Sequence, residues 1–307
     1  MPLTGLHLLL SYQCNYECDH CFVWGSPFNE GTMTLTFIRR ALKDAQDLGT
    51  IRKIYFEGGE PFLYYPIMVQ GIREAVDAGF EVGIVTNAYW ATSVEDAEVW
   101  LRPIAEIGIS DLSLSSDLYH GDRMETSEAM RGRKAATNLE IPVDLLQTYG
   151  PVLETNNLMA TEISDKNYGR VMFKGRAAEK LAHLATQHKW TEFIECDSEE
   201  LEDPGRVHID PFGFIHVCQG ISIGNLLKES LSQIVDSFKP NKHPIIGPLI
   251  EEGPVALVKR YHAPHESTYA DACHLCYQVR KRLRAQFPNT LSPNQMYNAT
   301  ANSTKAL

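Results

Sequence analysis

The stretch "LHLLLSYQCNYECDHCFVWGSP", residues 6–27, places three cysteines within eight residues, directly after an apolar run. Cys14, Cys18 and Cys21 stand at CxxxCxxC spacing, which lets one tight loop aim three thiolates at a single inorganic centre. A tetrahedral structural zinc site or a fully protein-ligated iron–sulfur cluster asks for four ligands. The set therefore indicates either a 4Fe-4S cluster with one open position or a zinc site whose fourth ligand is His20 or a distant cysteine.

Apolar runs alternate with amphipathic stretches downstream of this loop. Strands are predicted over residues 5–12, 51–59, 80–88, 109–117 and 141–149, and residues 169–185 are predicted as a sixth strand running into a helix. Helices are predicted over residues 34–49, 62–79, 93–108 and 122–138. This alternation indicates βαβ units and a parallel sheet. We expect an α/β fold, a partial (β/α)6 TIM-like barrel.

Unusual stretches follow each predicted strand of this barrel. They are "EGGEP" (57–61), "TNAYW" (86–90), "SSDLYHGD" (115–122), "QTYG" (147–150) and "KGRA" (174–177). In such barrels the chemistry gathers at the carboxyl ends of the strands. We therefore expect the cysteine loop and these stretches to meet at one end of the barrel.

The rhythm of the sequence changes from about residue 190. "VHIDPFGFIHVCQG" (207–220) predicts a β-hairpin that turns at Pro211, Phe212 and Gly213, and residues 225–238 predict an amphipathic helix. A stretch rich in Pro, Gly and His (240–266) leads to a CxxC at the head of a basic helix (271–287). We expect a barrel over 1–188, a small hairpin-and-helix domain over 189–287, and a loosely ordered polar tail over 288–307.

The composition and charge of the chain argue against nucleic acids and membranes as binding partners. The formal net charge of −11 argues against the basic surface that nucleic-acid binding requires. The sequence has no apolar run long enough to span a membrane, and its first residues lack a signal-peptide pattern. We expect a cytoplasmic protein with no nucleic-acid or membrane partner, in which seven cysteines are metal ligands or reactive thiols rather than disulfides.

Three motifs in order resemble the radical S-adenosylmethionine (radical SAM) superfamily. "CNYECDHC" (14–21) looks like its cluster loop, "EGGEP" looks like its GGEP element, and "SLSSD" (113–117) is similar to its ribose-side segment. The resemblance covers about residues 5–185. It implies that a unique iron of a 4Fe-4S cluster chelates the methionine end of S-adenosylmethionine, so that the cofactor supplies the ligand the cysteines leave out. An electron from the cluster then cleaves a C–S bond, and the 5′-deoxyadenosyl radical abstracts a hydrogen atom from the substrate.

The resemblance also assigns residues near the cluster. Cys14, Cys18 and Cys21 are then cluster ligands. Gly58, Gly59 and Glu60 should meet the methionine amino group, the glycines because backbone must approach a ligand closely. Further cofactor-binding candidates are Pro61, which stiffens the turn or begins a helix, His20, which lies near the adenine or is a surface histidine, and Phe22, Asn87 and Arg176.

Polar residues at the ends of the fourth and fifth strands are further candidates. Ser113, Ser115 and Asp117 alternate and so face one side of their strand. Ser113 and Ser115 are cofactor-binding candidates, and Ser115 and Asp117 are the better candidates for contact with ribose or substrate. Asp117, Gln147 and Tyr149 are the catalytic candidates. For Gln147, Tyr149 and Arg176, ordinary loop packing or solvation is the alternative.

The remaining cysteines, at 196, 218, 273 and 276, form a second group. Their order resembles the twitch domain, a shortened SPASM extension, and "DPFGFIHVC" followed by "IGNLLKESLSQI" is similar to its hairpin and helix. The resemblance implies a second, auxiliary 4Fe-4S cluster with four cysteine ligands. Structural zinc remains an alternative for this site, and a buried free thiol remains one for Cys196.

The barrel half is also similar to peptide epimerases, which are thought to donate hydrogen from a cysteine thiol. Seven cysteines divided between two clusters leave no donor thiol, which favours oxidation or carbon-centred bond formation over epimerisation. The first predicted strand begins almost at Met1, which favours a small-molecule substrate modestly over a leader peptide.

We thus expect a radical SAM enzyme that acts on a small molecule or a peptide and takes electrons from a flavodoxin or ferredoxin-type reductant. A peptide epimerase or cross-linking maturase is one alternative. A zinc-bearing interaction protein without enzymatic activity is another.

Overall fold

The computed structural model describes residues 3–120, 127–151 and 168–299. One nine-stranded sheet organises these residues, in the order β10-β9-β8-β1-β2-β3-β4-β5-β6. Its strands are β1 Gly5–Ser11, β2 Lys53–Gly58, β3 Glu81–Thr86, β4 Asp111–Ser115, β5 Val143–Tyr149, β6 Tyr168–Arg170, β8 Arg206–Ile209, β9 Phe214–Cys218 and β10 Ile221–Asn225. The first six pair in parallel, which confirms the predicted partial barrel.

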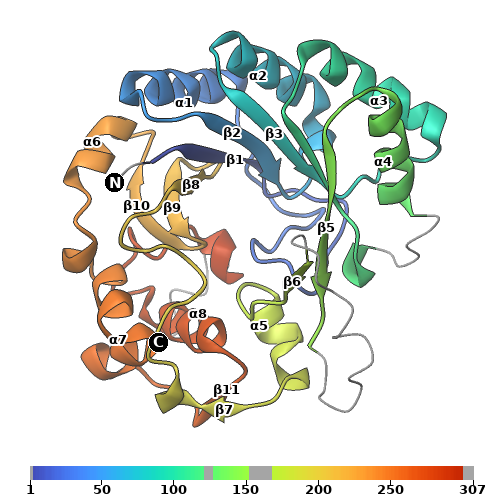
Figure 1. The fold of residues 1–307 in the computed structure, drawn as a ribbon. Coiled ribbons are helices and arrows are strands. Elements are labelled where there is room, and N and C mark those ends of the chain that lie inside the picture. The colour runs from blue at the N-terminus through green and yellow to red at the C-terminus, as the bar shows by residue number, and fades with distance from the viewer. Residues whose placement is uncertain (1–2, 121–126, 152–167, 300–307) are drawn as a thin grey trace.

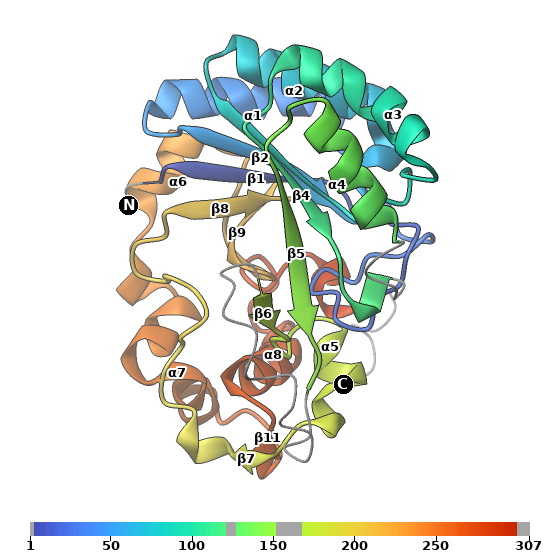
Figure 2. The same cartoon turned by 45° about the vertical axis from the view of Figure 1, so that its right-hand side comes forward.

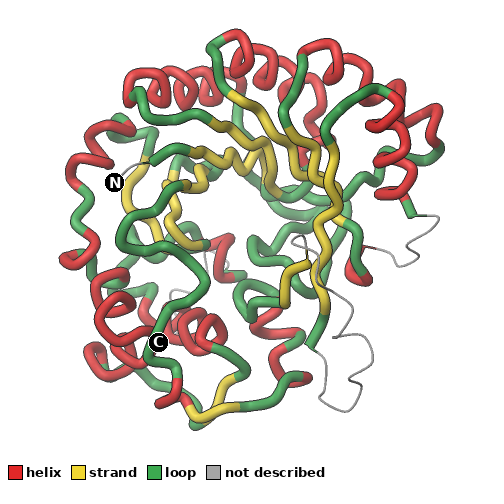
Figure 3. The backbone as a smooth tube through the Cα atoms, viewed as in Figure 1, coloured by secondary structure: helices red, strands yellow, loops and turns green. Residues whose placement is uncertain are grey.

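The helices of the barrel lie along the outer side of the curved sheet (Figure 1; Figure 3). They are α1 Leu35–Leu48, α2 Tyr65–Asp77, α3 Val94–Ile107 and α4 Glu128–Asn138. Residues 122–126 of the predicted helix over 122–138 lie outside the described part. The first helix begins at its Thr34 cap and ends at Gly49 in a left-handed conformation, as the sequence predicts.

The sixth βα unit is shorter than predicted. Only β6 and the single-turn helix α5 Ala177–Lys180 form, followed by a 3-10 turn over Ala182–Leu184. The turn between β6 and α5 contains Lys174, Gly175 and Arg176.

The C-terminal segment joins the same sheet instead of forming a separate one. Strand β8 pairs in parallel with β1, and β9 and β10 continue the sheet in antiparallel pairs (Figure 2). The predicted hairpin turn at residues 211–213 is confirmed, with Gly213 at φ +85°. The domain boundary at residue 188 remains a prediction.

Three predictions for the C-terminal segment are wrong. The helix over 225–238 begins only at α6 Leu231–Ser237, because Asn225 ends β10 and Ser230 forms a capping box with Gln233. A helix within 240–266 was missed, α7 Ile246–Tyr261, because non-helical residues at 252 and 253 break its pattern. Residues 288–299 are packed rather than loose, since Leu291, Met296 and Tyr297 are buried.

The CxxC lies at the start of α8 Ala272–Leu283, as predicted. A two-stranded sheet of β7 His188–Lys189 and β11 Thr268–Tyr269 lies nearby (Figure 1). Leu9, Tyr12 and Val23 share a buried apolar cluster with residues of α7 and α8, so the first cysteine loop packs against the C-terminal helices. None of the helices in the described ranges is both long and apolar enough to cross a membrane.

Candidate functional site: two cysteine groups joined by one turn

The loop after β1 carries Cys14, Cys18 and Cys21, and backbone and side-chain amides point at two of its sulfurs. The Cys14 Sγ accepts from the backbone N–H of Tyr16 at 3.4 Å and from the Asn87 side-chain amide at 3.7 Å. The Cys21 Sγ accepts from the backbone N–H of Gly25 at 3.2 Å. Hydrogen bonds of this kind stabilise a thiolate, and they tune the sulfurs of iron–sulfur clusters.

The electrostatics of this loop favour a cationic centre between the thiols. Burial, with smaller contributions from Glu60 and Cys21, raises the pKa of Cys14 to about 12. Burial and the same neighbouring thiols also raise the pKa of Cys18. Three thiolates held this close are stable only when a metal centre compensates their charge, so the donor set fits a metal cluster.

Arg176 holds the cysteine loop in place. Its guanidinium donates to the backbone carbonyls of Cys18 at 2.8 Å and Gly25 at 2.7 Å, and its own N–H donates to the carbonyl of Cys21 at 2.9 Å. The preceding Gly175 has φ +61°, and a Cβ there would lie 2.5 Å from the Phe22 carbonyl oxygen. The structure thus places Arg176 on the loop backbone, and its predicted contact with a cofactor remains a prediction.

The "EGGEP" turn packs against the end of β1. A Cβ on Gly58, which has φ +146°, would lie 2.5 Å from the Ser11 carbonyl oxygen, and one on Gly59 would lie 2.1 Å from that of Gln13. The glycines were predicted because a ligand must approach closely. In the structure the close approach that requires them is to the backbone of β1 and the cysteine loop.

Glu60 is fully buried and ties this turn to the end of β3. Its carboxylate accepts from the backbone N–H of Phe62 at 3.0 Å, the Thr86 hydroxyl at 2.8 Å and the backbone N–H of Asn87 at 2.8 Å. Burial raises its pKa to about 7, and these donors oppose the rise. Pro61 begins a 3-10 helix over Pro61–Tyr64, as its alternative interpretation predicts.

Asn87 connects the end of β3 to the cysteine loop. Besides the contact with Cys14, its amide donates to the Asn15 side chain at 2.9 Å. With the contacts of Glu60, this brings the ends of β1, β2 and β3 together at one edge of the barrel. The structure therefore gathers the three cysteines, the GGEP turn and Asn87, as the sequence predicts.

His20 lies in a second polar cluster, with Asp117 and His120. One ligand atom from each of the three lies within 4.8 Å of the others, and the His120 Nδ1 lies 2.8 Å from the Asp117 carboxylate. Burial lowers the pKa of His20 to about 4, and its Nδ1 has no hydrogen-bond partner among the described residues. His20 is therefore a largely enclosed side chain beside Tyr119, 4.5 Å between ring centroids, and not a surface histidine.

For the remaining predicted site residues, the described part of the chain shows no direct contact that assigns a role. The Ser113 hydroxyl donates to Asp111 on the same face of β4 at 3.0 Å, and Ser115 ends that strand, half-buried. Gln147 pairs in register with β6, and Tyr149 is exposed. Phe22 packs at the margin of the apolar cluster under α7 and α8. Their predicted roles remain predictions.

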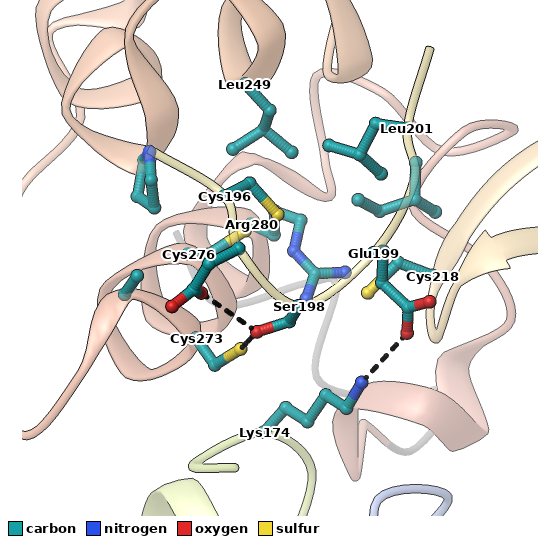
Figure 4. Close-up of a pocket in the computed structure, with 14 residues that line it drawn as sticks. Lys174, Cys196, Ser198, Glu199, Leu201, Cys218, Leu249, Cys273, Cys276 and Arg280 are labelled. Carbon is teal, nitrogen blue, oxygen red and sulfur yellow. Dashed lines mark hydrogen bonds and ion pairs between the residues drawn. The ribbon is translucent and has the colours of Figure 1, made fainter. Parts of the chain in front are cut away.

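The four later cysteines line one cavity, although the first and the last lie 80 positions apart in the sequence. Cys196 comes from the segment before β8, Cys218 from the end of β9, and Cys273 and Cys276 from the first turns of α8 (Figure 4). The cavity has about 390 Å³ of atom-free space, part of it open to solvent. The structure thus brings together all four members of the predicted second group, Cys196 included.

Two buried cations face this second group. The Lys174 amine donates to the Glu199 carboxylate at 3.2 Å (Figure 4). Burial alone would lower the pKa of Lys174, but Cys218, Glu199 and Cys273 raise it. The amine therefore stays charged. Arg280, 1% exposed, lowers the pKa of Cys276, which burial raises to about 11. The Ser198 hydroxyl lies 3.1 Å from the Cys273 Sγ. Buried thiolates would gain from both cations, so this donor set also fits a metal centre.

Residues 8–151 match the model of the Radical SAM superfamily. The matched segment contains the three cysteines and the GGEP turn.

The chain carries a radical SAM domain.

Curated relatives match parts of the chain. It is 26% identical over 118 residues to YydG of Bacillus subtilis, named as a peptide biosynthesis protein, with 38% of this chain and 37% of YydG covered. It is 32% identical over 114 residues to a tungsten-containing aldehyde ferredoxin oxidoreductase cofactor-modifying protein of Pyrococcus furiosus, with 37% and 30% covered. A nucleotide dehydratase of Fibrobacter that depends on S-adenosylmethionine is 24% identical over 181 residues, with 56% and 51% covered. The chain thus spans about half the length of these relatives or less.

Two solved structures share the fold beyond the matched domain. BtrN in complex with AdoMet and 2-DOIA superposes with a TM-score of 0.51 at 15% identity, covering 76% of this chain and 81% of BtrN. The protein anSMEcpe with bound AdoMet and a Cp18Cys peptide superposes with a TM-score of 0.52 at 13% identity, covering 96% and 99%. At such identities the likeness shows the fold alone, and it confirms the partial barrel.

Sequence reasoning missed the polar residues around the second cysteine group. Lys174 was inside the quoted "KGRA", but only Arg176 was singled out, and Arg280 was one of several cations on a basic helix. Ser198 and Glu199 carry no motif. The sequence did contain one indication of Lys174: in "KGRA" a cationic residue stands on each side of a glycine. In a tight turn, two such side chains can point to two different sites.

Substitution of Gly59 by Ala should destabilise the protein and disturb the first cysteine group. The new Cβ would lie 2.1 Å from the Gln13 carbonyl oxygen. Both atoms are attached directly to the backbone, so neither can move away by rotating a side chain. We expect the free energy of unfolding, measured by urea denaturation, to fall by about 2 kcal/mol or more. Gly205→Ala is the matched control, since nothing lies within 4 Å of its Cβ; its change should stay within about 0.5 kcal/mol. Equal stability of the two variants would show that the close approach of the two loops is not required.

Proposed function

We propose that this chain is a radical SAM enzyme that reductively cleaves S-adenosylmethionine and uses the 5′-deoxyadenosyl radical to abstract a hydrogen atom from its substrate. Support comes from the loop that presents Cys14, Cys18 and Cys21 beside the GGEP turn. When bound there, a 4Fe-4S cluster supplies the electron that cleaves the C–S bond and an iron that is free to hold the methionine end.

The chain's own residues position and enclose this chemistry. Asn87 and the backbone N–H groups of Tyr16 and Gly25 donate to the sulfurs proposed to bind the cluster. Arg176 holds the loop in place by donating to its backbone carbonyls. Glu60 keeps the GGEP turn at the end of β3 through three accepted hydrogen bonds. The half-buried cluster of His20, Asp117 and His120 stands beside the loop, where it would shield the adenosyl moiety from water.

We further propose that Cys196, Cys218, Cys273 and Cys276 hold a second 4Fe-4S cluster. The observation that carries this is their convergence on one cavity with Lys174 and Arg280, whose charges offset those of the thiolates. Oxidation of a substrate radical would release an electron and a proton, and a cluster held by these four cysteines would supply an acceptor for the electron. This favours net oxidation or carbon-centred bond formation, with a flavodoxin or ferredoxin-type protein as the external reductant.

Two substrate classes agree with this assignment. The named relatives include a peptide biosynthesis protein, and one structural neighbour holds a peptide, which supports a peptide-modifying maturase. The other neighbour holds the small molecule 2-DOIA, which supports a metabolite. Epimerisation is disfavoured, because both cysteine groups together use all seven cysteines and leave no thiol as a hydrogen donor.

Anaerobic reconstitution should give about eight irons per chain and absorbance at roughly 400 nm, because two 4Fe-4S clusters are expected. After reduction with dithionite, added S-adenosylmethionine should yield 5′-deoxyadenosine, measured by chromatography. Colourless protein that holds only zinc and forms no 5′-deoxyadenosine would reject the proposal in favour of a zinc-bearing interaction protein.

Substitution of both Cys273 and Cys276 by Ala should lower the iron content to about four per chain and leave cleavage of S-adenosylmethionine measurable, because the first cluster remains. The matched variant in the other group, Cys18→Ala with Cys21→Ala, should keep about four irons and form no 5′-deoxyadenosine. Cys196→Ala should behave like the Cys273 and Cys276 variant. If wild type holds about four irons and one zinc, and the Cys273 and Cys276 variant loses only the zinc, the second site is structural zinc.

A further inference from the structure

Three polar side chains that belong to neither cysteine group meet on the inner face of the barrel. In register, His7 of β1 lies opposite Tyr55 of β2 on one side and His208 of β8 on the other. Glu57 follows Tyr55 by two residues, so its side chain leaves β2 on the same face. The side chains of His7, Glu57 and His208 are 17%, 12% and 7% exposed. The interior of this barrel thus holds a charged cluster where a packed barrel would carry apolar side chains.

The two imidazole–carboxylate distances in this cluster fall in the range found between neighbouring ligands of one cation. The His7 Nδ1 lies 3.1 Å from one carboxylate oxygen of Glu57, and the His208 Nε2 lies 3.1 Å from the other. One ligand atom from each residue lies within 4.8 Å of the other two. Neighbouring ligands bound to a cation at about 2.1 Å stand roughly 3.0–3.4 Å apart in octahedral or tetrahedral geometry.

Two atoms of the cluster lack a hydrogen-bond partner among the described residues. The Glu57 Oε1 is close to the His208 Nε2 but has no aligned donor, and the His208 Nδ1 is also buried and unpaired. The side chain of His208 is more than nine-tenths buried, at 7% exposure, and that of Glu57 is 12% exposed. A buried carboxylate oxygen without a donor is costly unless an ion or a water satisfies it.

The protonation states suit ligands. Although burial alone would raise it, the imidazoles of His7 and His208 hold the pKa of Glu57 well below its usual range. Burial lowers the pKa of His208, and the carboxylate opposes this only in part. An ionised carboxylate and a neutral imidazole are the forms that bind a metal.

We propose that His7, Glu57 and His208 form a site for a divalent first-row cation inside the barrel. Two imidazoles and one carboxylate are a ligand set typical of Zn²⁺ and Fe²⁺, and they leave coordination positions open. His7 also lines a cavity with Lys53, Tyr55 and Arg206. A small molecule in that cavity can approach the cation from the side of His7. The role that follows is to hold and polarise such a group inside the barrel.

The experiment counts metal bound to the reconstituted protein, because its clusters would hide a visible spectrum of the added ion. Wild type is dialysed against micromolar Co²⁺, and bound cobalt and iron are measured per chain by mass spectrometry. The test variants are Glu57→Gln and His208→Gln. His188→Gln is the matched control, since His188 is an exposed histidine 3.7 Å from a carboxylate of Glu192.

We expect about one Co²⁺ per chain in wild type and in His188→Gln. The amount bound should fall at least about tenfold in Glu57→Gln and His208→Gln, while their iron content stays as in wild type. Co²⁺ should also raise the midpoint of thermal unfolding of wild type, a readout that needs no variant. The proposal is overturned if wild type binds no more Co²⁺ than Glu57→Gln, in which case the cluster is a hydrogen-bonded imidazole–carboxylate relay. Because the comparison is between proteins of equal iron content, it can be interpreted whether or not 5′-deoxyadenosine is formed.

Discussion

The turn at Lys174, Gly175 and Arg176 is the constraint on which both cysteine groups depend. Arg176 points to one side and holds the backbone of the first cysteine loop through its guanidinium and its own N–H. Lys174 points to the other side, into the cavity that the four later cysteines line. A Cβ on the left-handed Gly175 would lie 2.6 Å from the Cys21 carbonyl oxygen, so no larger residue fits between the turn and the loop. One short turn thus positions a cation at each site.

The two sites differ in the way their ligands are supplied, and the fold explains why. The first three cysteines come from one loop at the carboxyl end of β1, where neighbouring strand ends contribute Asn87 and the GGEP turn. The later four come from three separate segments, brought together because β8 and β9 extend the barrel sheet and α8 packs under it. Three thiols on one loop leave a metal centre one ligand short, whereas four thiols line the later cavity. In the proposed function the first site binds a reactant and the second serves electron transfer.

Much of this could be predicted from sequence, and the failures have physical reasons. The βα rhythm and the cysteine spacing are local, so the barrel and the first loop followed directly. The start of α6 was wrong because Asn225 serves the hairpin, donating to the Phe212 carbonyl at 3.0 Å, which no helical periodicity reveals. The tail was wrong because Tyr297 is buried by contact with Arg280 and Gly220, residues distant in sequence. The cluster of His7, Glu57 and His208 was invisible, since single polar residues on three strands form no motif.

Electron paramagnetic resonance of the reduced, reconstituted protein tests the central claim, an open three-cysteine site beside a closed four-cysteine site, most directly. Spectra are recorded with and without S-adenosylmethionine. We expect two overlapping signals of reduced 4Fe-4S clusters, of which one changes when S-adenosylmethionine is added, because only one cluster has an iron free to bind it. A spectrum in which neither signal changes, or in which both change, would contradict the assignment of an open and a closed site.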